Sequence, residues 1–117
     1  MGEHWNQLSN MQQLEEIEDV SASEPVVLFK HSTRCSISRM ALRNFQRDSA
    51  VGFPARLYYL DLLENREVSN AIANRFGITH QSPQIILIWS GRAAYHASHS
   101  DIDAETLRRK IIEVTGA

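Results

Sequence analysis

The stretch VVLFKHSTRCSISRMAL, residues 26–42, decides how this chain folds. It begins with a continuous apolar run, Val26–Lys30, which predicts a short strand that is buried on both faces. A polar loop follows, and residues 36–50 then have the spacing of a helix with one apolar side and one arginine-rich side. Cys35, the one cysteine among 117 residues, lies where the strand passes into the helix.

The alternation of strand and helix continues on both sides of this stretch. We expect helices over residues 10–20, 36–50, 64–78 and 101–116, and strands over residues 26–30, 55–63, 84–89 and 93–98. The order α-β-α-β-α-β-β-α predicts an α/β fold with parallel strands joined by right-handed crossovers, and a hairpin turn at Ser90–Ala94 adds an antiparallel edge. The sequence therefore predicts a single domain over residues 1–117, a four-stranded mixed sheet flanked by helices, with residues 1–10 as a loose segment.

The overall composition excludes several classes of function. A net charge of −2 offers no strong field for nucleic acid or for an anionic membrane surface, so we expect neither as a partner. No apolar run approaches the roughly 18 residues that a membrane span needs. The first residues lack the cationic start and apolar core of a secretory signal. A lone cysteine cannot form an internal disulfide, which fits a reducing compartment, and we expect a cytoplasmic protein.

The position of Cys35 favours a reactive thiol over a packed one. The free backbone N–H groups and the positive dipole end of a helix stabilise a thiolate at its N-terminus. Arg34 adds a permanent positive charge, Lys30 is expected close by, and His31 would accept a proton if the loop folds back. The alternative is a small buried hydrophobe. The polar neighbours argue against that alternative: they are Ser32, Thr33, Arg34, Ser36 and Ser38.

Two further patterns lie outside the first strand and helix. Ser82-Pro83 directly precedes the strand at residues 84–89, where a proline without a backbone N–H is tolerated; the ordinary expectation for its peptide bond is trans. His96 and His99 lie three residues apart, and such residues on a strand face opposite sides of the sheet. His31 and Cys35 have no second pair to complete a zinc site. We therefore expect no metal.

The order of these features resembles the thioredoxin-like superfamily over roughly residues 25–114. Asp61 ends a strand, Phe76-Gly77-Ile78 ends a helix, and Ser82-Pro83 stands where that fold carries its cis-proline. The segment LFKHSTRCSIS, residues 28–38, is similar to the active site of the YtxJ-like monothiol bacilliredoxins of the bacillithiol system, which have a Phe-Lys-His-Ser run followed by Cys-Pro-Ile-Ser. Ser36 departs from that pattern, because a proline is expected at its position.

The resemblance implies a thiol-disulfide oxidoreductase whose nucleophile is Cys35. It would remove bacillithiol, or a similar low-molecular-weight thiol, from mixed disulfides on proteins. Ser38 stands where a dithiol thioredoxin has its second cysteine, so a second small thiol must regenerate the enzyme. Bacillithiol is thus the expected co-substrate, S-thiolated proteins are the expected partners, and no tightly bound cofactor is expected.

The resemblance also assigns supporting roles around Cys35. The Ser38 hydroxyl would hydrogen-bond the thiolate, and Ser36 would begin the helix. With Pro83 in the cis form, the backbone of Ser82 would pair with an extended partner segment. Arg34 would meet the malate carboxylates of bacillithiol. The residues expected to line the same groove are Thr33, Arg34 and Gln84.

Two other functions remain open from the sequence. Monothiol glutaredoxins bridge an iron–sulfur cluster between two subunits with a Cys-Gly-Phe-Ser site, whereas this chain has Cys35-Ser36-Ile37-Ser38. The missing glycine and aromatic residue argue against that reading. A thioredoxin-like binding module with an inert Cys35 is the third reading, and it predicts ordinary alkylation of the thiol.

Overall fold

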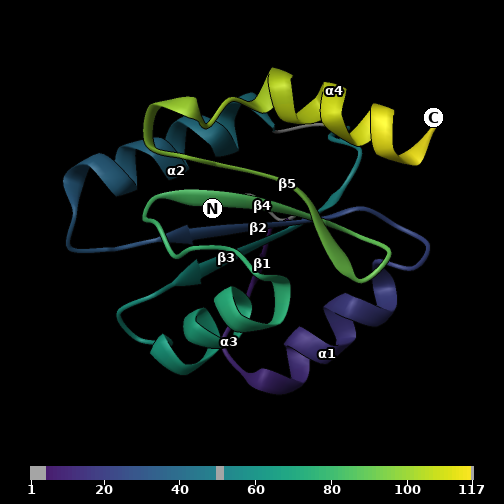
Figure 1. Ribbon diagram of the computed structural model, residues 1–117. Helices are drawn as coiled ribbons and strands as arrows, with labels where there is room; N and C mark the ends of the chain where they lie inside the picture. Colours follow the sequence, from purple (N-terminus) through teal and green to yellow (C-terminus); the bar gives the residue numbers. More distant parts are fainter. Residues whose placement is uncertain (1–4, 50–51, 117) are drawn as a thin grey trace.

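The computed structural model describes residues 5–49 and 52–116 and shows an α/β sandwich (Figure 1). One mixed sheet has the strand order β1-β3-β2-β4-β5. The parallel pairs are β1 with β3 and β2 with β3, while β4 is antiparallel to both β2 and β5. The elements in chain order are β1 Trp5–Gln7, α1 Met11–Val20, β2 Val26–His31, α2 Ser36–Asp48, β3 Arg56–Asp61, α3 Arg66–Phe76, β4 Gln84–Trp89, β5 Arg92–Ser98, the short 3-10 helix η1 His99–Asp101 and α4 Ala104–Thr115.

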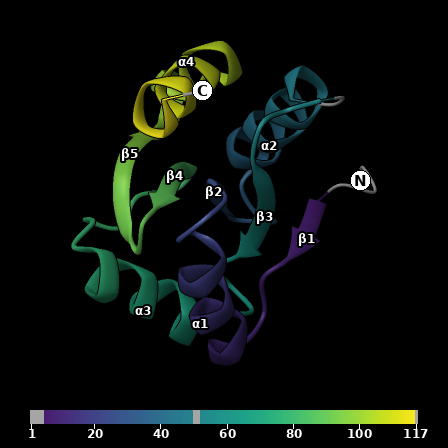
Figure 2. The ribbon, with the colours of Figure 1, turned by 90° about the vertical axis from the view of Figure 1, so that its right-hand side faces the viewer.

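Helices cover the sheet on both faces, as the sequence predicts. Helices α2 and α4 lie on one face, and α1 and α3 lie on the other (Figures 1 and 2). Every residue of the central strand β2 is buried. Its side chains alternate between the two faces: Val27 and Phe29 belong to the core beneath α2 and α4, whereas Val26 and Leu28 belong to the core above α1 and α3. The predicted two-sided burial of this strand is confirmed.

The N-terminal segment differs from its prediction. Trp5–Gln7 forms a fifth strand, which pairs in parallel with Leu57–Tyr59 at the edge of the sheet. Trp5 is 7% exposed and Leu8 is fully buried. These two apolar side chains anchor the segment to the domain, so residues 5–10 are not loose and the sheet has five strands instead of four. Three residues are too few to show a strand periodicity in the sequence. Residues 1–4 lie outside the described part of the chain.

The helix ends follow local capping chemistry. Gly77 ends α3 in the left-handed conformation with φ 64°, and its N–H donates to the Ala73 carbonyl. Of the two aspartates that could cap the last helix, Asp101 and Asp103, Asp103 caps α4 through the Thr106 N–H, and the helix begins at Ala104. Helix α2 ends at Asp48, and the predicted last residue, 50, is not among the described ones. Among residues 5–49 and 52–116, every helix is too short or too polar to cross a membrane.

Candidate active site

Cys35 is an exposed free thiol at the N-cap of α2. It closes a short loop, residues 32–35, that leads from the end of β2 into the helix; we call it the Cys35 loop. The Cys35 N–H donates to the Ser32 carbonyl at 3.2 Å, and the Cys35 carbonyl accepts from the Arg39 N–H at 3.0 Å. The backbone at Cys35 is thus held from both sides while its side chain is left open to solvent. The prediction that Cys35 opens the helix is confirmed.

Ser38 holds the Cys35 loop from below. Its side chain is fully buried, and its hydroxyl oxygen accepts from the Ser32 N–H at 2.9 Å. The side chain at this position therefore points under the loop. A hydroxyl there cannot form a disulfide. The proposed hydrogen bond from Ser38 to the Cys35 thiolate stays a prediction, since the contact shown is the one with Ser32.

Thr33 ties the Cys35 loop to the neighbouring strand. Its hydroxyl donates to a carboxylate oxygen of Asp61 at 3.1 Å. Asp61 is 7% exposed, and its other carboxylate oxygen accepts from the Leu63 N–H at 3.1 Å. In the sequence Asp61 marks only the end of a strand, and its contact with the Cys35 loop was not predicted. Parallel strands place their carboxyl ends at one edge of a sheet, so an acidic residue ending β3 could have been assigned to the site that follows β2.

His31 lies at the end of β2 and is 4% exposed. Its ring is tilted against that of Tyr59, with centroids 6.1 Å apart. Burial lowers the pKa of the imidazole, and the nearby Asp61 carboxylate offsets part of that effect. Neither ring nitrogen has a hydrogen-bond partner among the described residues. The ring is therefore enclosed in the protein instead of folded back over the loop, and its role as proton acceptor for Cys35 stays a prediction.

Lys30 does not lie beside Cys35, and this expectation from the sequence is wrong. Side chains alternate along a strand, so Lys30 points to the face of α1 and α3, opposite to that of His31. Its fully buried ammonium donates to the Ser69 carbonyl at 3.1 Å and lies 3.3 Å from Nδ1 of His80. Burial lowers the pKa of Lys30 to about 8, and burial together with the Lys30 charge lowers the pKa of His80.

The segment before β4 has the backbone that the fold resemblance implied. The Ser82–Pro83 peptide bond is cis. Pro83 directly precedes Gln84, which is the register partner of Lys30, so Pro83 lies beside the end of β2 from which the Cys35 loop departs. The His99 N–H donates to the Pro83 carbonyl at 3.0 Å. The Ser82 hydroxyl oxygen is buried and has no partner among the described residues.

Gln84 was expected to line a groove beside Cys35, and the structure corrects this. The side chain is 1% exposed and faces the same side of the sheet as Lys30. Its amide nitrogen donates to the Thr79 carbonyl at 3.1 Å, and its amide oxygen accepts from the Gln81 N–H at 3.4 Å. Gln84 therefore braces the residues that lead to Pro83 from within the protein. The sequence does not show that Gln84 pairs with Lys30 and therefore faces the interior on the same side of the sheet.

The remaining predicted site residues are exposed. Thr33, Arg34 and Ser36 all lie at the surface around Cys35, and Ser36 is the first residue of α2. Arg34 forms none of the ion pairs that the structure shows among its described residues. The structure thus groups Cys35 with its loop neighbours and sets the buried His31 and Ser38 beneath them, while Lys30 lies on the opposite face of the sheet.

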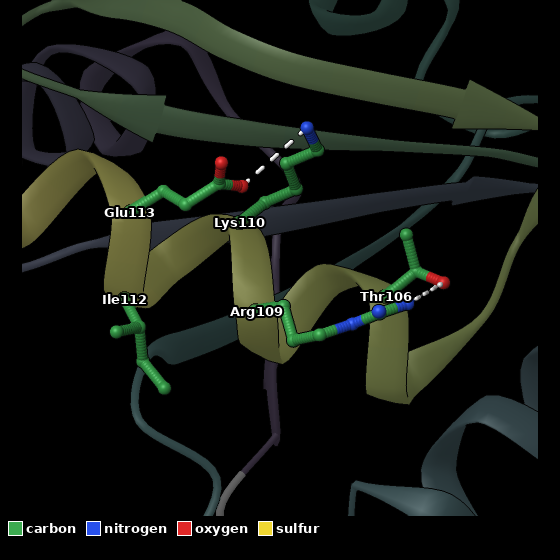
Figure 3. A pocket seen from close by; sticks show the side chains of 5 residues that line it. All are labelled: Thr106, Arg109, Lys110, Ile112 and Glu113. Carbon is green, nitrogen blue, oxygen red and sulfur yellow. Dashed lines mark hydrogen bonds and ion pairs between the residues drawn. The ribbon is translucent and has the colours of Figure 1, made fainter.

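Two other features of the surface lie outside the group around Cys35: a hollow on α4 and the pair His96 and His99. A hollow of about 480 Å³ lies on α4 and contains none of the predicted site residues (Figure 3). Its polar side chains bind one another, with Lys110 paired to Glu113 at 3.4 Å and Arg109 donating to Thr106 at 3.4 Å. His96 lies on β5 and His99 in η1, and the described residues contain no group of three or more metal-ligating side chains.

Comparisons with known proteins agree with this geometry. A family model described as monothiol bacilliredoxin BrxC matches residues 6–107. A solved structure described as a candidate oxidoreductase with a thioredoxin fold is 27% identical, with a TM-score of 0.76, and the match covers 91% of this chain and 92% of that one.

Two thioredoxins share the fold at lower identity. The thioredoxin of Malassezia sympodialis is 16% identical with a TM-score of 0.73, over 97% of this chain and 91% of that one. The thioredoxin of Fasciola hepatica is 17% identical with a TM-score of 0.70, over 92% of this chain and 97% of that one. The thioredoxin-like fold expected from the sequence is confirmed.

Proposed function

Because the chain belongs to the monothiol bacilliredoxin family and is a thiol oxidoreductase of thioredoxin-like fold, we propose that it removes bacillithiol, or a similar low-molecular-weight thiol, from mixed disulfides on proteins. The observation that supports this most is the exposed Cys35 thiol at the N-cap of α2, in a loop that the buried Ser38 and Asp61 hold in place. One free thiol on a hydrogen-bonded loop suits exchange with an external disulfide.

The proposed reaction has two exchange steps. In the first, the Cys35 thiolate attacks the sulfur of the small thiol in the mixed disulfide. A disulfide between Cys35 and the small thiol forms, the protein–sulfur bond breaks, and the protein leaves as a thiolate that takes a proton from water. In the second, the thiolate of another small-thiol molecule attacks the same sulfur. It leaves with the first small thiol as a symmetric disulfide and restores the Cys35 thiolate.

The surroundings of Cys35 support each step. The free N–H groups at the start of α2 stabilise negative charge on sulfur. Arg34 is exposed and forms no described ion pair, so its guanidinium is available to the carboxylates of the small thiol. The buried Ser38 supplies no thiol, and the second step therefore consumes an external one. Since both steps need free thiols, we propose a reducing compartment such as the cytoplasm as the place of action.

The first experiment is intact mass spectrometry of the reduced protein after exposure to bacillithiol disulfide. Glutathione disulfide is tested in parallel, and Cys35→Ser is the control. We expect one adduct of bacillithiol mass, absent from the control and formed faster than the glutathione adduct. A protein carrying a bacillithiol mixed disulfide is then added to the reduced enzyme, and we expect the same adduct together with the free protein thiol.

The possible results separate the candidate functions. Equal rates with the two disulfides would retain the exchange reaction and refute the assignment to bacillithiol. No adduct would refute the exchange reaction and leave the inert binding module. A coloured protein with an absorbance that is lost in Cys35→Ser would identify the iron–sulfur reading instead.

A further inference from the structure

The exposed side of α2 next to Cys35 has an unusual combination of side chains. Ile37 is 71% exposed and Met40 is 60% exposed, and both belong to the first five residues of the helix. They lie three positions apart, so they are neighbours on one face. Arg43 follows Met40 by three positions on the same face, and Arg39 lies beside Arg43 on the side of the helix away from Ile37; both arginines are exposed. We call this set, together with Arg34, the α2 surface.

The charges of the α2 surface are not balanced within the protein. Arg47 at the far end of the helix pairs with Asp48 at 3.1 Å, whereas neither Arg34, Arg39 nor Arg43 forms an ion pair with any described residue. Arg39, Arg43 and Arg47 follow each other at four-residue spacing, and α2 has no acidic residue in its first turn. Like charges at this spacing, and cations near a helix N-terminus, oppose helix stability. An acidic partner would relieve both effects.

We propose that the α2 surface docks an acidic segment of the substrate protein that also places an apolar side chain beside the mixed disulfide. This proposal rests on the function proposed above. Ile37 and Met40 would cover the apolar side chain, and Arg39 and Arg43 would meet the carboxylates. The chain as a whole has a net charge of −2, so the positive field is local to the nucleophile.

The length of the α2 surface favours a protein segment over the small thiol. Arg43 follows Cys35 by about two helical turns, which at 1.5 Å per residue corresponds to roughly 12 Å along the axis. A small thiol bonded to Cys35 meets Arg34 first, at the N-terminus of the helix. The other residues of the α2 surface lie farther along the helix. A polypeptide that continues on either side of the modified cysteine would extend over them.

The test uses single-cysteine peptides that carry a bacillithiol mixed disulfide and differ in their flanking residues. One peptide has aspartates and a leucine around the cysteine, one has lysines and the leucine, and one has aspartates and a serine. The rate of thiol transfer to Cys35 is measured at low salt and at high salt. Each variant's rate is divided by its own rate with hydroxyethyl disulfide, which has no charge and no peptide.

At low salt we expect the acidic leucine peptide to react about 10-fold faster than the lysine peptide, and the ratio to fall to about 2-fold at high salt. Arg39→Glu and Arg43→Glu should each abolish or reverse this ratio. Arg92→Glu, an equal charge change at the hairpin on the opposite end of the sheet, should leave it unchanged. Met40→Ser should remove the advantage of leucine over serine, whereas Ile112→Ser on α4 should not.

Several outcomes would overturn the docking proposal. Equal rates for acidic and basic peptides would refute it, and the bacillithiol adduct would still form on Cys35, so the proposed function would stand. A preference that persists in both Arg39→Glu and Arg43→Glu would show that other residues select the substrate. Transfer from hydroxyethyl disulfide but from no peptide would refute both the docking surface and the removal of thiols from proteins.

Discussion

Replacing Lys30 by methionine should change how the free energy of unfolding depends on pH. The Lys30 ammonium is fully buried and is hydrogen-bonded to a neutral carbonyl and to His80. No carboxylate among the described residues lies within ion-pair distance of it. Desolvation therefore lowers its pKa from 10.5 to about 8.

The sign of the effect follows from proton binding. Between pH 8 and pH 10.5 the unfolded chain still holds the proton that Lys30 has lost in the folded protein, so stability rises with pH across this window. The full window corresponds to about 3 kcal/mol, and about 2.5 kcal/mol of it is gained between pH 7 and pH 10. Methionine has no proton to lose. The stability of Lys30→Met relative to the wild type should therefore fall by about 2.5 kcal/mol over this range.

The assay is urea unfolding followed by circular dichroism at pH 7, 8, 9 and 10, with linear extrapolation to water. Both proteins carry Cys35→Ser, which removes the one thiol from the comparison. Lys110→Met is the matched control, since Lys110 is 43% exposed on its side chain and pairs with Glu113 at the surface of α4. A difference between Lys30→Met and wild type that stays constant with pH would refute the inference that the ammonium is desolvated.

Three further changes test other parts of the structure. Leu8→Ala should lower the free energy of unfolding by about 2–5 kcal/mol in urea titrations, because Leu8 is fully buried; a loss below about 0.5 kcal/mol would mean that this segment is not part of the core. Ser38→Ala removes the acceptor of the Ser32 N–H, so we expect a loss of about 1–2 kcal/mol and faster amide hydrogen exchange at Ser32; unchanged exchange would show that the hydroxyl does not hold the loop. Asp103→Ala should cost about 1 kcal/mol at pH 7 through loss of the α4 cap. Hydrogen bonds from Thr106 lower the pKa of Asp103, so this difference should persist above the ordinary value of 3.8 and vanish as the pH falls below it; thermal unfolding at pH 7 and pH 2 checks this.

The sequence is most informative about Cys35 because the relevant signals are local. An apolar run, a polar loop and a helical pattern follow one another within residues 26–42, and they are sufficient to place a thiol at a helix N-terminus. The proline before β4 is equally local. These features need no knowledge of which segments pair, and the structure confirms the position of Cys35 and the thioredoxin-like order of strands and helices.

The buried polar residues could not be placed in this way. Lys30 and His31 are adjacent in the sequence and belong to the same resemblance motif, yet they face opposite sides of the sheet. Lys30 meets α3 and the segment before Pro83, whereas His31 meets Tyr59. Gln84 shares the side of Lys30 because the antiparallel register aligns the two. Gln84 follows Lys30 by more than fifty residues, and Tyr59 follows His31 by about thirty. These contacts therefore depend on how distant strands pair.

The sequence by itself determined the place of Cys35 at a helix start, the α/β order and the absence of a second thiol, because periodicity, residue spacing and a count of cysteines are properties of the chain alone. Only the tertiary structure decided what holds the Cys35 loop in place. The Ser38 hydroxyl turns under the loop, Asp61 arrives from β3, and Trp5–Gln7 adds an edge strand. The contacts of Asp61 and of Trp5–Gln7 result from register between distant segments, which the free energy of the whole fold selects and no short stretch of sequence encodes. The Ser38 contact spans six residues, and the direction of its hydroxyl is seen only in the folded loop.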